Sequence, residues 1–170
     1  FHDVAVNALE QANRDIIVID INDQQAGLEN SKSIGDLEYE SFLETGDQNF
    51  EWIRPKDEWQ AIGLSYTSGT TGKPKGVVYH HRGSYLMSMG SVTAWNMPNK
   101  LTYLYTVPMF HCNGWGYPWT LAMLHAKIIF IRNIVVKEIF QLISQYKVTH
   151  FGGAPIVLNM IANAPKEEQL

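Results

Sequence analysis

The residues of this chain that are best suited to chemistry lie in one loop, Tyr66–Gly76, which reads YTSGTTGKPKG. The loop contains four hydroxyl residues, three glycines and two lysines. Glycines let backbone N–H groups turn toward an anion, hydroxyls add rotatable donors, and lysines add compact positive charges. Serine, threonine and glycine are also common in ordinary surface turns. The density of donors beside two lysines nevertheless favours a site for a polyphosphate.

Two common phosphate-binding loops do not match this pattern. A Walker loop needs Gly-x-x-x-x-Gly-Lys followed by Ser or Thr. Here Pro74 follows the Gly72-Lys73 pair, and no glycine stands five residues before Gly72. A dinucleotide-binding loop of the Gly-x-Gly-x-x-Gly type does not fit either.

The loop instead resembles the signature of the adenylate-forming superfamily, which contains acyl-CoA synthetases, the adenylation domains of peptide synthetases, and luciferases. That signature runs from an apolar strand residue through Ser/Thr-Ser/Thr-Gly-Thr-Thr-Gly-x-Pro-Lys, and Leu64 with Thr67–Lys75 satisfies it. Lys73 stands at the variable position and is the weaker candidate of the two lysines. The resemblance implies that the β- and γ-phosphates of ATP are held by Thr67, Ser68, Gly69, Thr70, Thr71, Gly72 and Lys75.

Two later segments resemble the family's acyl-pocket motifs. They are VPMFHCNGW (Val107–Trp115) and THFGGAPIVLNMI (Thr149–Ile161). Binding groups gather at the carboxyl ends of parallel strands, where His111 is expected, although a lone histidine serves structure equally well. The paired glycines allow either tight packing or close approach of the backbone to a substrate. The resemblance implies an acyl pocket formed by His111, Trp115, Gly152, Gly153 and Ala154.

Several other conspicuous side chains are predicted to be structural. Trp119 is expected to pack in the core, and Cys112 to be a small buried filler rather than a nucleophile. His80, His81 and Arg82 do not form a metal site, because adjacent strand residues face opposite sides and no carboxylate or cysteine completes the set. We predict no metal site in this chain.

The elements that must position these residues alternate between strands and helices. A helix is predicted over the first dozen residues, then a short strand at Ile16–Asp20 and a short helix within Asp36–Glu51. From Ile62 the pattern becomes regular, and Pro155 is expected in the first turn of the last helix. Strands are predicted at 61–67, 76–81, 101–109, 127–131 and 148–153, and helices at 82–95, 114–125 and 136–146. This alternation predicts an α/β fold with a mainly parallel sheet flanked by helices.

Composition excludes several classes of function. The chain has 170 residues, 45% of them hydrophobic and 18% charged, as in ordinary globular proteins. A net charge of −4 without a basic stripe argues against a nucleic-acid partner. The single cysteine, Cys112, excludes an internal disulfide and favours a reducing compartment, for which we expect the cytoplasm. The longest apolar region, 114–131, is interrupted by Pro118, His125 and Lys127, so no membrane span is expected.

The resemblance also implies a reaction and its small-molecule partners. A carboxylate attacks the α-phosphate of ATP to give an acyl-adenylate and pyrophosphate, and the thiol of coenzyme A then displaces AMP. ATP with Mg²⁺ and coenzyme A are expected for the whole enzyme, and none of them for folding of this chain. The run DLEYESFLETGDQNFEWIRPKDEW is similar to a plant and bacterial branch that activates short- and medium-chain carboxylic acids. The sequence does not identify which acid.

Members of this family are much longer than the present chain. The Tyr-Gly-x-Thr-Glu segment, the ribose-binding aspartate, the hinge and the C-terminal lysine domain do not occur in it. We therefore expect residues 1–170 to be an internal part of the large N-terminal AMP-binding domain, inactive alone. Such a part should expose apolar surface that could drive self-association. Two alternatives are a stand-alone nucleotide- or anion-binding module, and part of an adenylation domain that loads a carrier protein.

Overall fold

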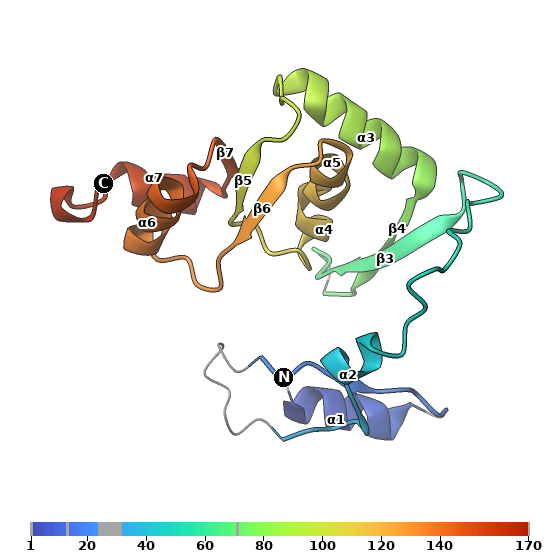
Figure 1. The fold of residues 1–170 in the computed structure, drawn as a ribbon. Coiled ribbons are helices and arrows are strands. Elements are labelled where there is room, and N and C mark those ends of the chain that lie inside the picture. The colour runs from blue at the N-terminus through green and yellow to red at the C-terminus, as the bar shows by residue number, and fades with distance from the viewer. Residues whose placement is uncertain (1, 13, 24–31, 71, 170) are drawn as a thin grey trace. The chain divides into compact units, whose positions relative to one another are not determined.

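The computed structural model describes residues 2–12, 14–23, 32–70 and 72–169 (Figure 1). The chain divides into two compact units, Phe1–Ile53 and Arg54–Leu170. Each unit has its own secondary structure and is described separately below. Every predicted site residue belongs to the second unit.

The N-terminal unit is built from short elements. It contains α1 (His2–Gln11), β1 (Ile19–Asp20), β2 (Leu37–Glu38) and α2 (Tyr39–Leu43), and the two strands pair in parallel. The carboxylate of Asp20 accepts hydrogen bonds from the backbone N–H groups of Ile34 and Gly35, at 2.9 and 2.8 Å, which holds the segment before β2 beside β1. Both predicted helices are confirmed, whereas the predicted strand at 16–20 keeps only its last two residues.

The C-terminal unit is organised around a three-stranded parallel sheet. Its order is β6–β5–β7, with β5 (Thr102–Tyr105) between β6 (Lys127–Phe130) and β7 (His150–Gly152). The parallel register places Tyr103 between Ile128 and His150. The predicted parallel sheet is therefore confirmed for these three strands, although β5 ends at Tyr105 rather than at residue 109.

Helices cover both faces of this sheet. Side chains alternate along β5, so each face carries large side chains that a helix can bury. Leu104 points to one face, where it packs with Ile139 of α6 (Val136–Tyr146) and Val157 of α7 (Pro155–Ala162). A short 3₁₀ helix, η2 (Lys166–Glu168), follows α7. Fully burying one such aliphatic side chain stabilises the fold by about 1.5–3 kcal/mol.

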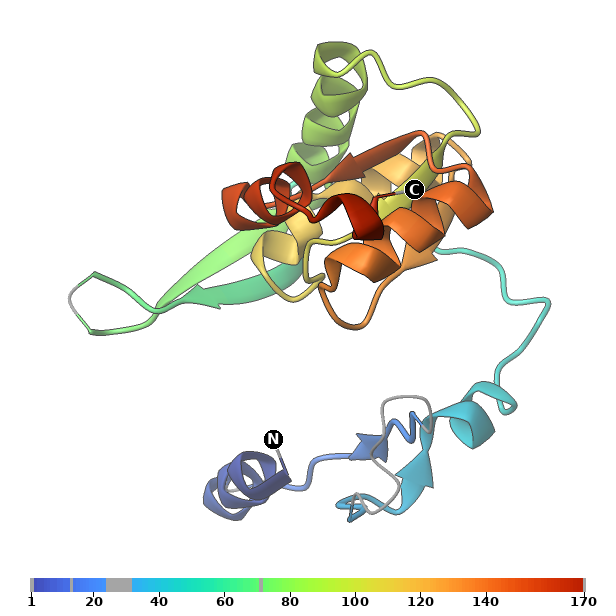
Figure 2. The ribbon, with the colours of Figure 1, turned by 90° about the vertical axis from the view of Figure 1, so that its left-hand side faces the viewer.

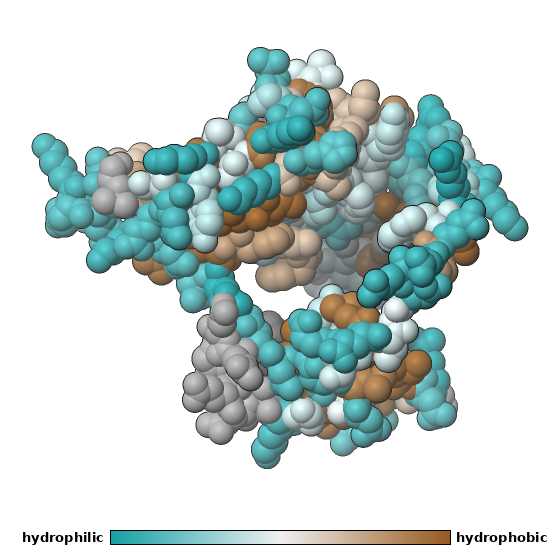
Figure 3. Space-filling model, viewed as in Figure 1, coloured by the Kyte–Doolittle hydropathy of each residue, from teal (hydrophilic) through white to brown (hydrophobic). Residues whose placement is uncertain are grey.

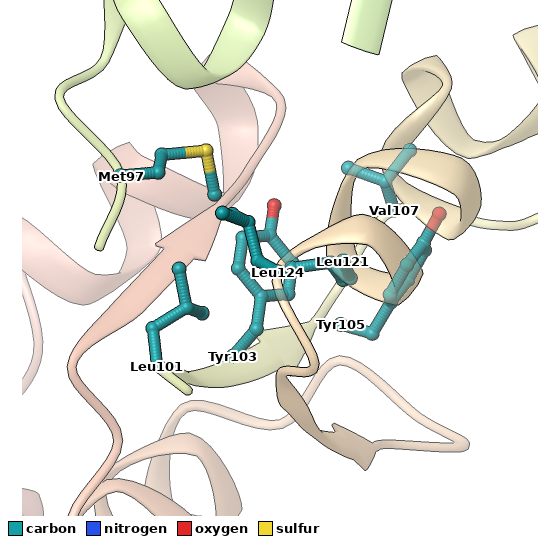
Figure 4. Close-up of a cluster of buried hydrophobic side chains, with 7 residues drawn as sticks. All are labelled: Met97, Leu101, Tyr103, Tyr105, Val107, Leu121 and Leu124. Carbon is teal, nitrogen blue, oxygen red and sulfur yellow. The ribbon is translucent and has the colours of Figure 1, made fainter. Parts of the chain in front are cut away.

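The opposite face carries the larger aromatic cluster, beside α3 (His81–Ala94) and α5 (Tyr117–Met123) (Figure 4). Leu121 of α5 is completely buried between the sheet and the helices. The buried cluster consists of Met97, Leu101, Tyr103, Tyr105, Val107, Leu121 and Leu124. Two of its members are phenols, so this face of the sheet carries polar atoms inside an otherwise apolar core.

A separate antiparallel hairpin precedes the parallel sheet. It is formed by β3 (Ala61–Thr67) and β4 (Lys75–His80), with Ser65 opposite Val77 and Thr67 opposite Lys75. A mainly parallel sheet was expected, but the short link 68–74 permits only an antiparallel pair, because a parallel crossover needs about a dozen residues or more. Figure 2 shows the hairpin projecting from the rest of its unit.

The predicted helix over 114–125 is wrong in its first part. The chain forms α4 (Cys112–Trp115), whose residues have positive φ angles, and the right-handed helix α5 begins only at Tyr117. Gly116, with φ +71°, separates the two elements. Left-handed backbone cannot continue into a right-handed helix, so two separate elements, α4 and α5, occupy the region where one helix was predicted.

Large apolar side chains remain exposed on both units, and hydrophobic atoms reach the surface in Figure 3. In the C-terminal unit Tyr66, Tyr85 and Ile156 are 68%, 62% and 68% exposed. No helix within the described ranges is long and apolar enough to cross a membrane.

Candidate functional site

The predicted phosphate loop forms the tip of the β3–β4 hairpin. Two of its glycines have left-handed backbone, Gly69 with φ +68° and Gly72 with φ +79°. A β-carbon on Gly69 would overlap the carbonyl of Lys73, and the N–H of Gly72 donates to the carbonyl of Gly69 at 3.3 Å. The loop therefore needs glycine at Gly69 for both conformation and space.

The polar side chains of this loop face solvent. Thr67, Ser68, Thr70, Lys73 and Lys75 are exposed, whereas Thr71 lies outside the described residues. Within the described ranges, no hydrogen bond or ion pair engages the hydroxyls of Thr67, Ser68 and Thr70 or the ammonium of Lys75. These donors are therefore not used by the described part of the chain, and an anion is the kind of ligand that such groups could bind.

The second feature is a left-handed turn, Cys112–Gly116, which follows β5. Its φ angles are +48°, +44°, +57°, +57° and +71° in order. The phenol of Tyr105 donates a 2.9 Å hydrogen bond to the carbonyl of Gly114, which is buried. The hydroxyl of Ser65 in β3 donates to the side-chain oxygen of Asn113 at 3.2 Å. The turn is thus tied to the sheet on one side and to the hairpin on the other.

A cavity of about 330 Å³ lies between this turn and the end of β7. Three predicted acyl-pocket residues, Trp115, Gly152 and Gly153, are brought together in its wall. His111 is exposed at the start of α4, and Ala154 caps α7; neither lines the cavity. The complete lining is Trp95, Met97, Tyr103, Trp115, Tyr117, His150, Phe151, Gly152, Gly153 and Leu158.

Gly152 lies in a tightly packed position at the wall of the cavity. A β-carbon there would lie 2.8 Å from the phenol oxygen of Tyr103 and 3.9 Å from the indole of Trp115. Its carbonyl accepts a hydrogen bond from the hydroxyl of Thr106. The glycine therefore packs tightly against Tyr103, and it also lines the adjacent cavity.

Three tyrosines lie together beside the cavity. The ring of Tyr103 stacks on Tyr117 at 5.1 Å and meets Tyr105 edge-on at 5.7 Å. Burial, followed by the neighbouring phenols, raises the pKa of Tyr103 far above its usual value, and burial with Tyr117 nearby raises the pKa of Tyr105 to about 12. Burial likewise raises the pKa of Tyr117. All three phenols are therefore neutral at physiological pH. The phenol of Tyr105 donates to Gly114, whereas the hydroxyl of Tyr103 is buried without a hydrogen-bond partner among the described residues.

Sequence reasoning missed most of the cavity wall. Tyr103 and His150 are neighbours only because β5 and β7 pair in parallel, and Tyr117 is contributed by the helix α5. The one available signal was the alternation in TYLY, which puts Tyr103 and Tyr105 on the same face.

Other side chains lie where packing explains them, with one exception. His80 accepts a 3.0 Å hydrogen bond from the N–H of Gly83 and caps α3, while Arg82 pairs with Glu58 at 2.6 Å. No group of three or more potential metal ligands occurs within the described ranges. Trp119 is half-buried. The prediction that Cys112 is buried is wrong, because the left-handed turn leaves it exposed.

Comparisons with known proteins agree with the signature in the loop. The family model described as "AMP-binding enzyme" matches residues 2–170. The chain is 51% identical over 155 residues to a peroxisomal acetate/butyrate–CoA ligase of Arabidopsis thaliana, covering 91% of this chain and 27% of that protein. It is 51% identical to an acetate–CoA ligase of Humulus lupulus and 46% identical to a 2-methylpropanoate–CoA ligase of the same plant. These matches cover 84% and 78% of this chain, and 25% and 24% of those proteins.

Solved structures show the same fold at lower identity. The N-terminal domain of FACL13 from Mycobacterium tuberculosis matches with a TM-score of 0.69 and 23% identity, covering 79% of this chain and 34% of that one. O-succinylbenzoate coenzyme A synthetase from Bacillus subtilis, in complex with ATP and magnesium, matches with a TM-score of 0.66 and 20% identity, covering 76% and 27%. The chain thus spans about a quarter of the length of the curated relatives it matches.

Proposed function

The chain belongs to the AMP-binding enzyme family, and we propose that it is part of the N-terminal domain of an ATP-dependent acyl-CoA ligase. In this proposal the hairpin loop holds the phosphates of ATP, and the cavity beside Trp115 holds the acyl group. The observation that carries the proposal is the loop itself, whose exposed donors and lysines have no internal partner within the described ranges.

The loop residues act by charge stabilisation. When a carboxylate attacks the α-phosphate of ATP, negative charge builds on the departing pyrophosphate. Hydroxyls of Thr67, Ser68 and Thr70, with the ammonium of Lys75, stabilise that charge where it develops. Gly69 and Gly72 give the loop its left-handed backbone. The N–H of Gly72 bonds to the carbonyl of Gly69, and the other backbone N–H groups of the loop are proposed to add to the same cradle. Thr71 is proposed to contribute a further hydroxyl on the strength of the signature alone.

The acyl group lies against an apolar, aromatic wall in this proposal. Trp115, Gly152 and Gly153 line the cavity, and His111 and Ala154 are proposed to approach the carboxylate end from outside the wall. Matching relatives are named for acetate, butyrate and 2-methylpropanoate, so short alkanoic acids are the proposed substrates. Positioning the carboxylate accounts for much of the rate, because the reacting groups are then held in attack geometry.

Magnesium and coenzyme A complete the proposed reaction. The described residues of this chain offer hydroxyl, amide and ammonium donors at the loop but no cluster of carboxylates, so the fit is to the phosphates and not to the metal. Mg²⁺ would neutralise charge on the phosphates, and we propose that it would be held by groups outside this chain.

The compartment is proposed to be the cytoplasm, although one relative is named peroxisomal. A fluorescent fusion of the complete protein tests this proposal.

The experiment is an acid-dependent ATP–pyrophosphate exchange assay on the protein encoded by the complete reading frame, followed by thioester detection after coenzyme A is added. We expect exchange with acetate, butyrate or 2-methylpropanoate, and the matching acyl-CoA. Exchange without any thioester would favour a carrier-loading adenylation domain. ATP binding without exchange would favour a binding module. Residues 1–170 alone are expected to be inactive and, with their exposed apolar side chains, to self-associate in sedimentation experiments.

A further inference from the structure

The left-handed turn Cys112–Gly116 lies between the hairpin that carries the loop and the wall of the acyl cavity. Positive φ angles at five consecutive residues are rare, and three of the five are not glycine. Backbone of this kind persists only where surrounding contacts over-determine it, and it clusters at functional sites. The contacts that hold this turn are therefore candidates for a functional role. One contact comes from the hairpin and the other from the sheet beside the cavity.

The contact with the hairpin is made by one side chain. The Ser65 hydroxyl donates to the amide oxygen of Asn113, and both residues are half-buried. A β-carbon on Gly63 would lie 3.7 Å from the amide nitrogen of Asn113, so the amide lies along the face of β3 that Gly63 and Ser65 share. Thr67 is the next residue on that face, and it begins the phosphate loop.

The contact with the cavity is made by the other half of the turn. The phenol of Tyr105 holds the carbonyl of Gly114, and a β-carbon on Gly114 would overlap that phenol oxygen. The next residue, Trp115, is 41% exposed and lines the cavity beside Gly152. Only Gly114 thus separates the residue whose amide contacts the hairpin from Trp115, whose indole lines the cavity.

We propose that the Ser65–Asn113 hydrogen bond couples the phosphate loop to the acyl cavity, so that Ser65 and Asn113 are positioning residues that set acid selectivity through Trp115. The inference rests on the proposed function. When the phosphates of ATP bind the hairpin loop, the hydrogen bond fixes the turn and with it the indole that lines the cavity. Neither side chain needs to touch ATP or the acid. The hydroxyl and the amide oxygen act only as a link of defined length.

The test uses the complete protein with Ser65→Ala, Asn113→Gly and the double variant. Glycine at position 113 removes the amide while permitting the positive φ angle. Ser65→Thr keeps a hydroxyl and is the rescue variant. Thr93→Ala is the matched control, because it removes an exposed hydroxyl that bonds only to the carbonyl of Met89 within α3.

The first readout is the ratio of kcat/KM for acetate to that for butyrate. Coupled residues give non-additive effects, so each single variant should change this ratio about 5-fold, and the double variant no more than either single one. Ser65→Thr and Thr93→Ala should retain the wild-type ratio. Unchanged acid preference in both single variants, with measurable activity, would overturn the coupling while leaving the proposed function intact.

The second readout does not depend on turnover. Amide hydrogen exchange of the peptide containing residues 112–116 is followed with and without a non-hydrolysable ATP analogue. The analogue should slow exchange at least 3-fold in the wild type and in Ser65→Thr, but not in Ser65→Ala. Equal slowing in Ser65→Ala would also overturn the coupling. Failure of the wild-type protein to bind the analogue or to adenylate any acid would instead overturn the proposed function, and this inference with it.

Discussion

Thr67 and Lys75 face each other as the last pair of residues across the β3–β4 hairpin. Both are exposed, and the loop that they close contains the remaining donors of the signature. The antiparallel pairing therefore sets the width of the loop mouth and brings a hydroxyl and an ammonium to the same opening. Lys73 lies within the loop itself and is not part of this pair.

Lys75→Ala should lower kcat/KM for ATP by about 10- to 100-fold, because a hydrogen bond to a charged group contributes about 1.5–3 kcal/mol. Lys73→Ala should have a smaller effect. Steady-state pyrophosphate release by the complete protein measures both. Lys137→Ala removes an exposed lysine of α6 and is the control. Equal losses for Lys73→Ala and Lys75→Ala would contradict the pairing argument.

Two alanine substitutions in the loop should differ in severity. Gly69→Ala meets the carbonyl of Lys73, whereas Gly72→Ala meets no atom within 4 Å. Both force a side chain into left-handed backbone, at about 1–2 kcal/mol, but only Gly69→Ala must also displace the chain. Titration with a fluorescent ATP analogue should show a larger loss of affinity for Gly69→Ala. The opposite order would mean that the loop adopts another conformation when it binds.

Gly152→Ala should make the cavity smaller from the side of β7. The added methyl group would lie 2.8 Å from the phenol oxygen of Tyr103, so it must shift toward the indole of Trp115 or displace the ring. One methylene changes discrimination by about 1–3 kcal/mol, so butyrate should lose roughly 10-fold or more in kcat/KM relative to acetate. Competition between the two acids measures the ratio. A uniform loss for both acids would indicate damage to the fold instead.

The parts of this fold that depend on local sequence could be predicted. The loop proposed to bind phosphate consists of contiguous residues, and α6 begins and ends where the sequence pattern placed it, at Val136 and Tyr146. Predicted strands at 61–67 and 127–131 also agree with β3 and β6 to within one residue. In each of these segments the pattern of apolar residues and the flanking polar or glycine residues point to the same element.

What could not be predicted depends on contacts between distant segments. Residues 114–116 of the left-handed turn were expected to begin a helix. The observed conformation is stabilised by Ser65 and Tyr105, which lie outside the turn in the sequence. The exposure of Cys112 follows from the same turn. The cavity wall likewise requires the β5–β7 pairing, which brings Tyr103 beside His150. No pattern within a single segment contains that information.

Tyr105→Phe should change how stability depends on pH. Burial raises the pKa of Tyr105 from 10.0 to about 12, so the folded state holds this proton more tightly than the unfolded state. Its contribution is complete below pH 10 and is lost as the pH rises from 10 to 12. At pH 8, Tyr105→Phe should cost about 1 kcal/mol through the lost hydrogen bond to Gly114. Urea unfolding of the complete protein at pH 8 and pH 11 should show a smaller alkaline loss in the variant. The Thr93→Ala control should keep the wild-type pH dependence, and an equal alkaline loss in Tyr105→Phe would show that this phenol is not held neutral by the fold.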